Sequence, residues 1–415
     1  IVLVDALPLS PSGKIDRSRL PDALAAEATA EGSIPPSTTL ERHIATLWQE
    51  ALGREQVGVN QNFFDLGGTS LQAATLTVKL GEQLGVHVPT ALLFDLADIG
   101  QIARRLVQLH RQALEPLFGH DAVAAYDRDP AAAATSPHEL HPLLVPLKPE
   151  GDLAPLFMVH PPGGIVACYR ELARLMNPAR PLYAIRSRGI HGDERLPETL
   201  AAMAGEYAAA IRSLEPNGPY LLGGWSLGGV IAAAVAAQLV AAGGTIDRLV
   251  LLDSALPDSS LPADVDAGMH AGMEYGLDVD LEDLSRMSPE EQLPFLFEHA
   301  RRLGVLDTGA PEELATRVLA ELRALFAHHV ALCEGHRLDP CPIDAVLFRP
   351  RDVPFETGGP EDRGWGRFLR SVDVRRVPGL HHSMVMQPHV AGLAAALDAV
   401  LAEAVVEHQT SAVGG

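Results

Sequence analysis

The sequence has few cysteines, no long hydrophobic run and too few basic residues to balance its acidic ones. Its three cysteines, Cys168, Cys333 and Cys341, have the spacing of neither a metal site nor a disulfide framework. They suit a reducing compartment, so we expect a cytoplasmic protein. With 32 Lys and Arg against 53 Asp and Glu, the formal net charge is −21. Because such a chain repels phosphates, nucleic-acid binding is not expected.

No signal peptide is visible, and the longest apolar segment, residues 230–242, is too short to span a bilayer and contains Gln238. We therefore expect no membrane association and interpret this segment as a helix buried against a sheet. The chain has 415 residues, 47% of them hydrophobic, enough for two or three domains. Because Ile1 falls in what resembles a strand, we expect the sequence to begin inside a domain of a longer polypeptide.

One stretch organises the chain: Pro219-Tyr-Leu-Leu-Gly-Gly-Trp-Ser-Leu-Gly-Gly229. An apolar strand leads into Gly-Trp-Ser226-Leu-Gly, and a helix rich in Ala, Val and Leu follows. Strand, sharp turn and helix are the context in which G-x-S-x-G presents a nucleophilic serine. The glycines allow strand and helix to approach closely around a strained serine. A serine that merely caps the helix is the less favoured interpretation.

Around this stretch, strands alternate with helices from residue 143 onward. The predicted strands are residues 156–160, 182–185, 220–222, 247–253, 343–348 and 372–377, and the clearest helices are residues 169–176, 200–214, 230–242 and 390–405. Such alternation implies a mostly parallel sheet covered on both faces. Ser226 would then lie outside the carboxyl ends of the strands.

A serine nucleophile needs a base, and the base needs a carboxylate to orient it. The chain order in this fold is serine, acid, histidine. Asp253 ends the strand after the nucleophile helix, and Asp352 follows a later strand; either can be the acid. His381 and His382 are adjacent candidates for the base.

Another histidine pair, His328-His329, lies on a predicted helix without a carboxylate at ligand spacing, which favours packing and surface roles over a metal site.

Two further features bear on the site. His160-Pro-Pro-Gly-Gly164 follows the first predicted strand, where Gly163 can supply one oxyanion-hole N–H and Leu227 the other. The loop is alternatively only a turn, and its prolines carry no N–H. The long insertion at about 255–335 is predicted to be a helical lid. Its apolar residues either pack the lid or line an acyl channel: Phe295, Leu296, Phe297, Leu325 and Phe326.

A small helical module precedes this domain. Thr38 or Thr39 caps its first helix and Gly53 ends it. The apolar residues of that helix lie on one face: Leu40, Ile44, Leu47, Trp48 and Leu52. A second helix opens at Ser70, and a last one covers residues 94–106. We predict a small all-α four-helix bundle of about 75 residues, a size that can fold alone.

Asn62-Phe-Phe-Asp-Leu-Gly-Gly-Thr-Ser-Leu71 is similar to the D-x-G-G-x-S-L signature of peptidyl carrier domains. The resemblance implies that Ser70 carries covalent 4′-phosphopantetheine, attached by a phosphopantetheinyl transferase. A phosphodiester at a helix start would meet free N–H groups and the positive dipole end. The alternative is that Ser70 is only an N-cap.

Ser12-Gly-Lys14-Ile-Asp-Arg17 resembles the last segment of adenylation domains in nonribosomal peptide synthetases, whose loop lysine matches Lys14. The remainder of such a domain is absent, so Lys14 is expected to be a solvated loop residue.

The region from about 143 to 408 looks like the terminal thioesterase domain of the same synthetases, an α/β-hydrolase. Its marks are the G-W-S-x-G-G elbow, the L-L-D strand end and the G-x-H motif before a methionine. Mapped onto these motifs, the resemblance implies Ser226 as nucleophile, Asp253 as acid and His381 as base, with no metal.

The implied reaction transfers a peptidyl thioester from the arm on Ser70 to Ser226 and releases it by hydrolysis or macrocyclisation. Adenylation and condensation domains upstream would be partners. A free serine esterase and a carrier module with an inactive hydrolase fold remain alternatives. The expected layout is an adenylation tail (1–20), a linker (21–37), the carrier (38–110), a second linker (111–142), the thioesterase (143–408) and a disordered tail (409–415).

Overall fold

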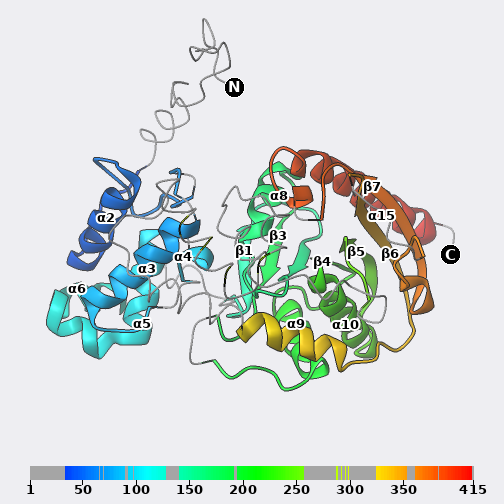
Figure 1. Cartoon of the computed structure of the whole chain (residues 1–415), viewed down its shortest axis with the longest axis horizontal. Coiled ribbons are helices and arrows are strands. Elements are labelled where there is room, and N and C mark those ends of the chain that lie inside the picture. The colour runs from blue at the N-terminus through cyan, green and yellow to red at the C-terminus, as the bar shows by residue number, and fades with distance from the viewer. Residues whose placement is uncertain are drawn as a thin grey trace, which may run out of the picture. The chain divides into compact units, whose positions relative to one another are not determined.

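The structure of the protein is a computed structural model, and it describes most of the chain from residue 33 onward. The described ranges are 33–64, 66–68, 70–88, 92–96, 98–127, 140–190, 194–256, 324–352, 360–381 and 383–413, with single positions at 287, 291, 295 and 298. The predicted adenylation tail with Lys14, and most of the predicted lid, lie outside them. The chain splits into two compact units, Ile1–Ala132 and Ala133–Gly415, and each is described by itself (Figure 1).

All regular secondary structure in the described part of the first unit is helical. Its helices are α2 (Thr39–Leu52), α3 (Ser70–Leu84), α4 (Leu92–Asp95), α5 (Ile99–Phe118) and α6 (His120–Ala124). α2 begins as predicted: the Thr38 side chain accepts from the Glu41 N–H, and the Glu41 carboxylate accepts from the Thr38 N–H. Gly53 ends the helix in the left-handed region, with φ 64°.

The predicted apolar stripe of α2 forms the core of this unit. Leu40, Ile44 and Trp48 are fully buried. The Trp48 ring meets the ring of Phe63 edge-on, with centroids 4.9 Å apart. The loop between α2 and α3 is thereby fixed to the first helix.

The prediction of a linker starting at residue 111 was wrong. α5 continues to Phe118 past non-helical dihedral angles at His110, and α6 follows. Leu114 and Val123 are fully buried, and the Tyr126 hydroxyl donates to Glu41 Oε1 at 3.2 Å. Since these apolar and polar contacts reach back to the first helix, residues 111–127 form part of the helical unit.

The second unit is an α/β-hydrolase fold built on a mixed sheet. Seven strands are described: β1 (Leu144–Lys148), β2 (Leu156–Val159), β3 (Leu182–Ile185), β4 (Tyr220–Trp225), β5 (Ile246–Leu252), β6 (Cys341–Pro350) and β7 (Leu369–Val377). Their order is β1-β3-β2-β4-β5-β6-β7. All neighbours are parallel except β1 and β3. The sequence analysis predicted every strand but β1.

Helices cover both faces of the sheet (Figure 1). α9 (Leu200–Leu214) and α10 (Leu227–Ala241) pack on one face, and α8 (Arg170–Leu175) and α15 (Val390–Val413) on the other. β2 alternates accordingly: Phe157 belongs to the first apolar cluster and Met158 to the second. The central strands are thus buried on both sides, and their carboxyl ends are left for the site.

α15 continues to Val413, through residues 409–413 that we expected to be a disordered tail. Within the described part of the chain, no helix is both long and apolar enough to cross a bilayer.

Candidate active site

Ser226 sits in a strained turn between β4 and α10. Its φ of 57° and ψ of −127° are unusual for a residue with a β-carbon. The close approach of strand and helix requires glycine on both sides. A Cβ on Gly224 would come within 2.2 Å of the Gly228 carbonyl, and one on Gly228 within 2.6 Å of the His160 oxygen. The elbow therefore has the geometry that its sequence predicts.

Asp253 follows β5, the strand adjacent to β4. The Ser226 N–H donates to the Leu252 oxygen at 2.9 Å, so the elbow is tied to the residue directly before Asp253. Of the described non-glycine residues, three have positive φ: Ser226 (57°), Asp253 (41°) and Arg363 (54°). Backbone strain in this unit is concentrated at the end of the sheet where these residues lie.

The Asp253 carboxylate is buried, and each of its oxygens contacts a basic side chain, His381 or Arg363. Its Oδ2 lies 2.7 Å from His381 Nδ1, and its Oδ1 accepts from Arg363 Nη2 at 3.2 Å. Burial alone would raise the pKa of Asp253. The hydrogen bond from His381, with the charges of His381 and Arg363, outweighs burial and holds this pKa below its ordinary value. Asp253 is therefore an ionised partner for an imidazole.

His381 is positioned by the residue that precedes the nucleophile. Trp225 Nε1 donates to the His381 carbonyl oxygen at 3.1 Å, and the two rings lie 5.4 Å apart with an interplanar angle of 33°. His381 is about one quarter exposed at its side chain. The imidazole is thus anchored beside the elbow on one side and to Asp253 on the other.

The rival residues are placed differently. The exposed Asp352 accepts from the Gly379 N–H at 2.7 Å, and its own N–H donates to the Gly379 oxygen at 3.1 Å. These two hydrogen bonds to Gly379 stabilise the loop that carries His381. His382 lies outside the described residues.

Tyr169 contributes to the elbow although no motif pointed to it. This fully buried residue accepts from the Trp225 N–H at 2.8 Å and donates to the Val159 oxygen at 2.7 Å. Burial and the neighbouring Cys168 raise the pKa of Tyr169, so its hydroxyl keeps its proton. The contact joins residues 56 positions apart, and only the folded arrangement of β2 and β4 could reveal it.

The loop after β2 turns tightly at its glycines. Gly164 has φ 84°, and its N–H donates to the Pro161 oxygen at 2.9 Å. Within the described residues, neither the Gly163 N–H nor the Leu227 N–H has a hydrogen-bond partner. Leu227 opens α10, where the first N–H groups of a helix have no intrahelical acceptor. Each amide thus has a hydrogen that no described acceptor uses.

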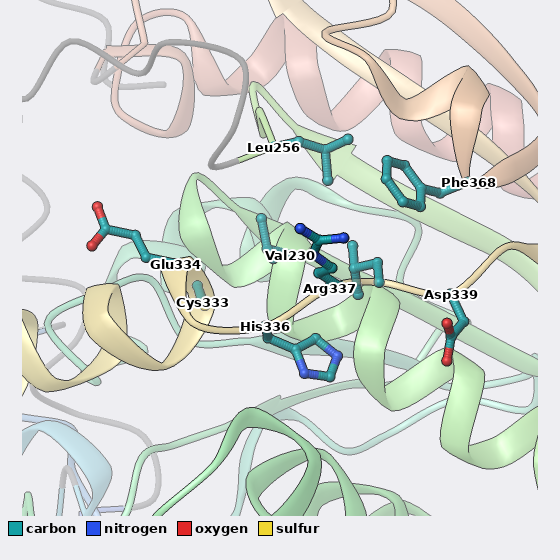
Figure 2. Close-up of a pocket in the computed structure, with 9 residues that line it drawn as sticks. Val230, Leu256, Cys333, Glu334, His336, Arg337, Asp339 and Phe368 are labelled. Atoms are coloured by element: carbon teal, nitrogen blue, oxygen red, sulfur yellow. The ribbon is translucent and has the colours of Figure 1, made fainter.

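A cavity of about 700 Å³ lies where the insertion leaves and rejoins the sheet (Figure 2). Leu256, just after β5, lines it together with residues 333, 334 and 336–339, which lead into β6. Val230, one helical turn after Ser226, and Phe368 add apolar contacts to a lining that also holds polar side chains: Glu334, His336, Arg337 and Asp339. Burial raises the pKa of Cys333, in the same lining, to about 12.

In the first unit, α3 begins at Ser70, as predicted. The preceding turn is fixed by the Gly67 N–H, which donates to the Phe64 oxygen, and by the Gly68 N–H, which donates to the Phe63 oxygen, both at 3.0 Å. A Cβ on Gly68 would come within 2.3 Å of the Phe63 ring. Glycine is therefore required for the turn to pack against the core and deliver Ser70 at a helix start, where a phosphate group is favoured.

Comparison with known families matches both units. Residues 42–106 match the phosphopantetheine attachment site family, and residues 154–322 match the thioesterase domain family.

Relatives of the chain include two synthases. The chain is 33% identical over 371 residues to the dimodular nonribosomal peptide synthase of Bacillus subtilis, covering 89% of this chain and 14% of that protein. It is 32% identical over 259 residues to an indigoidine synthase of Streptomyces lavendulae, covering 62% of this chain and 18% of that protein. The chain thus spans less than one fifth of the length of these relatives.

Among solved structures, holo-AB3403, a four-domain nonribosomal peptide synthetase bound to AMP and glycine, aligns with 96% of this chain and 28% of its own, at 23% identity and a TM-score of 0.54. This likeness supports the fold.

Proposed function

The chain carries the phosphopantetheine carrier domain and the thioesterase domain of nonribosomal peptide synthetases, and from this we propose that Ser226, His381 and Asp253 release a peptide delivered by Ser70. The observation that carries the proposal is the 2.7 Å contact between His381 and the ionised Asp253 beside the strained elbow.

In the first half-reaction, His381 Nε2 takes the proton of the Ser226 hydroxyl as its oxygen attacks the thioester carbonyl. Asp253 holds Nδ1–H, which fixes the tautomer and stabilises the imidazolium that forms. The protonated imidazole then gives its proton to the departing thiolate, leaving an ester on Ser226.

The developing oxyanion needs preorganised donors. We assign this role to the Gly163 and Leu227 N–H groups, which have no other acceptor in the described part of the chain. In the second half-reaction His381 activates water, or an amine or hydroxyl of the bound peptide, so the same residues serve hydrolysis or macrocyclisation.

The first unit belongs to the family that carries covalent 4′-phosphopantetheine, and we propose Ser70 as the attachment residue. Once attached, the group presents an acyl chain as a thioester. The residues present fit it: Ser70 opens α3, behind a turn held close to Phe63 by Gly68. A phosphopantetheinyl transferase, and adenylation and condensation domains of the parent synthetase, are the proposed partners.

We further propose that the insertion between β5 and β6 is a lid and that the cavity at its two ends holds part of the acyl chain. The 700 Å³ volume supports this, since small-molecule sites have similar sizes. Val230, Leu256 and Phe368 offer apolar contacts, and the charged side chains of Glu334, Arg337 and Asp339 line the same cavity.

The deciding experiment uses a phosphopantetheinyl transferase to move the peptidyl-phosphopantetheine part of a peptidyl-coenzyme A onto the full chain, with release of adenosine 3′,5′-bisphosphate, and identifies the released product by mass spectrometry. We expect free or cyclic peptide. Ser226→Ala should retain the loaded peptide, and Ser70→Ala should not be loaded at all. Release by Ser226→Ala at the original rate would contradict the proposal.

A further inference from the structure

Two buried histidines are hydrogen-bonded to the loop that carries Gly163, residues 160–164. His160 Nδ1 lies 2.7 Å from the Pro161 oxygen, and His329 Nδ1 lies 2.6 Å from the Pro162 oxygen. Both side chains are fully buried, and their rings are 4.7 Å apart. The sequence predicted packing and surface roles for the pair His328-His329. The His329 ring is buried and hydrogen-bonded, so a surface role is wrong for this residue.

The proton positions follow from the partners. A carbonyl oxygen can only accept, so Nδ1 of each ring carries the hydrogen. Nε2 of His160 then accepts from the Tyr207 hydroxyl at 2.7 Å. Nε2 of His329 lies 2.8 Å from the Ser187 hydroxyl oxygen, whose single hydrogen it shares with the Arg188 carbonyl oxygen at 2.7 Å. Burial, as the largest cause, lowers the pKa of His329 to about 4 and that of His160 well below its ordinary value, so both rings are neutral.

The His329 bond has a consequence for the next residue. The Pro162 carbonyl and the Gly163 N–H are the two ends of one planar trans peptide and point in opposite directions. Whatever fixes that carbonyl also fixes the direction of the N–H. A hydrogen bond donated to the carbonyl also polarises the amide, which makes its N–H a stronger donor.

The helix of residues 324–334, at the end of the insertion, holds the same loop by packing. Leu325 Cδ2 lies 2.8 Å from the position of a Cβ on Gly164. Leu325 is buried, which favours the packing interpretation over an acyl channel for this residue.

We propose that His329 is a positioning residue for the oxyanion hole: its Nδ1–H holds the Pro162–Gly163 peptide so that the Gly163 N–H faces the reacting carbonyl. The proposal rests on the proposed function of Ser226 and Gly163. It also connects the end of the insertion to the reaction, because His329 belongs to the helix through which the chain returns to the sheet.

The test compares His329→Leu, His329→Asn and the control His328→Leu in the full chain, with an acyl N-acetylcysteamine thioester as substrate. Leu fills similar space without a donor, whereas the amide nitrogen of Asn stands where Nδ1 stood. His328 lies on the same helix as His329, and its Nε2 is 2.9 Å from the Pro197 oxygen, outside the loop of residues 160–164. Titration with a serine-directed fluorophosphonate gives the fraction of folded sites in each preparation.

We expect His329→Leu to lower kcat at least about 10-fold per titrated site with KM nearly unchanged, and His329→Asn to recover most of the loss. The affinity for an alkyl boronic acid, which forms a tetrahedral anion on serine, should fall by a factor similar to that for kcat. His328→Leu should match the parent protein.

If His329→Leu lowers only the melting temperature, or if Asn fails to rescue kcat, the positioning role is wrong. Ser226→Ala, measured alongside, separates this failure from that of the proposed function: continued turnover in Ser226→Ala would overturn the nucleophile itself.

Discussion

His381 Nδ1 lies 2.7 Å from Oδ2 of Asp253, although the two residues are 128 positions apart in the chain. The parallel order of β5, β6 and β7 makes this contact possible, because the ends of these strands meet at one edge of the sheet. Asp253 has a left-handed φ of 41° there, and its Oδ1 accepts a hydrogen bond from Arg363.

This contact predicts which carboxylate matters. Asp253→Asn should lower kcat by about 1,000-fold or more, because the amide cannot hold the imidazole in the required tautomer. The matched control is Asp352→Asn, whose amide oxygen can still accept from the Gly379 N–H; its kcat should change less than about 10-fold. Steady-state kinetics with a small thioester measures both. An equal loss in the control would reassign the acid.

A second prediction concerns the elbow. In Gly228→Ala the new methyl group meets the backbone oxygens of Val159 and His160 at 2.7 and 2.6 Å, which cannot move aside. We expect a loss of about 2 kcal/mol or more in the free energy of unfolding.

Gly205→Ala on α9 is the control for that substitution, since no atom lies within 4 Å of its added methyl. It should stabilise the protein by about 0.5 kcal/mol, as Gly is a poor helix former. Thermal unfolding of the two variants of the full chain decides the matter. Equal stability in both would mean that the close approach at Gly228 is not rigid.

A third prediction concerns Tyr169. Tyr169→Phe leaves the buried Trp225 N–H without its acceptor, which should cost about 1–3 kcal/mol. The elbow should also become less rigid, so kcat should fall. Tyr183→Phe on β3, which keeps the ring stacked on Phe157, should change stability by less than about 0.5 kcal/mol. Denaturant unfolding and kinetics of the pair test this, and a harmless Tyr169→Phe would contradict it.

A fourth prediction concerns acid stability. His160 and His329 remain neutral when folded but take up protons when unfolded, below about pH 6.5. The unfolded state therefore binds more protons, and stability falls as the pH is lowered from 6.5 toward 4, by up to about 1.4 kcal/mol per pH unit for each histidine.

His329→Asn removes one of these two groups. We expect a shallower decline of unfolding free energy between pH 6.5 and 4 in this variant, measured by urea denaturation at each pH. An unchanged slope would show that His329 does not stay neutral in the folded protein.

A fifth prediction concerns the cavity in Figure 2. Phe368 forms part of its wall beside Leu256, so Phe368→Trp should reduce the space for a long acyl chain. KM for a long-chain acyl thioester should rise about 5-fold, while an acetyl thioester serves as the internal control and should be unaffected. Parallel changes for both substrates would argue against acyl binding there.

The sequence predicted those features whose geometry is determined by residues close together in the chain. The G-x-S-x-G pattern, its flanking strand and its helix predicted the strained Ser226. The capping pattern at Thr38 and Glu41 predicted the start of α2. In each case the residues that determine the geometry are neighbours in the chain.

Spacing alone could not choose between Asp253 and Asp352, because both follow parallel strands at the same edge of the sheet. The difference is a hydrogen bond to His381 across 128 positions. Tyr169 and His329 were missed for the same reason, since each acts on a distant backbone group. The helical residues 111–127 were taken for a linker because their burial depends on α2 and not on their own periodicity.

Cys333 lines the cavity, and its side chain is almost fully buried in the apolar cluster that α9 and α10 share with the sheet. Burial raises the pKa of Cys333 to about 12, so at neutral pH the sulfur remains a protonated, weakly reactive thiol. In the folded protein this sulfur should therefore react slowly with thiol-directed reagents, and it should become reactive on unfolding.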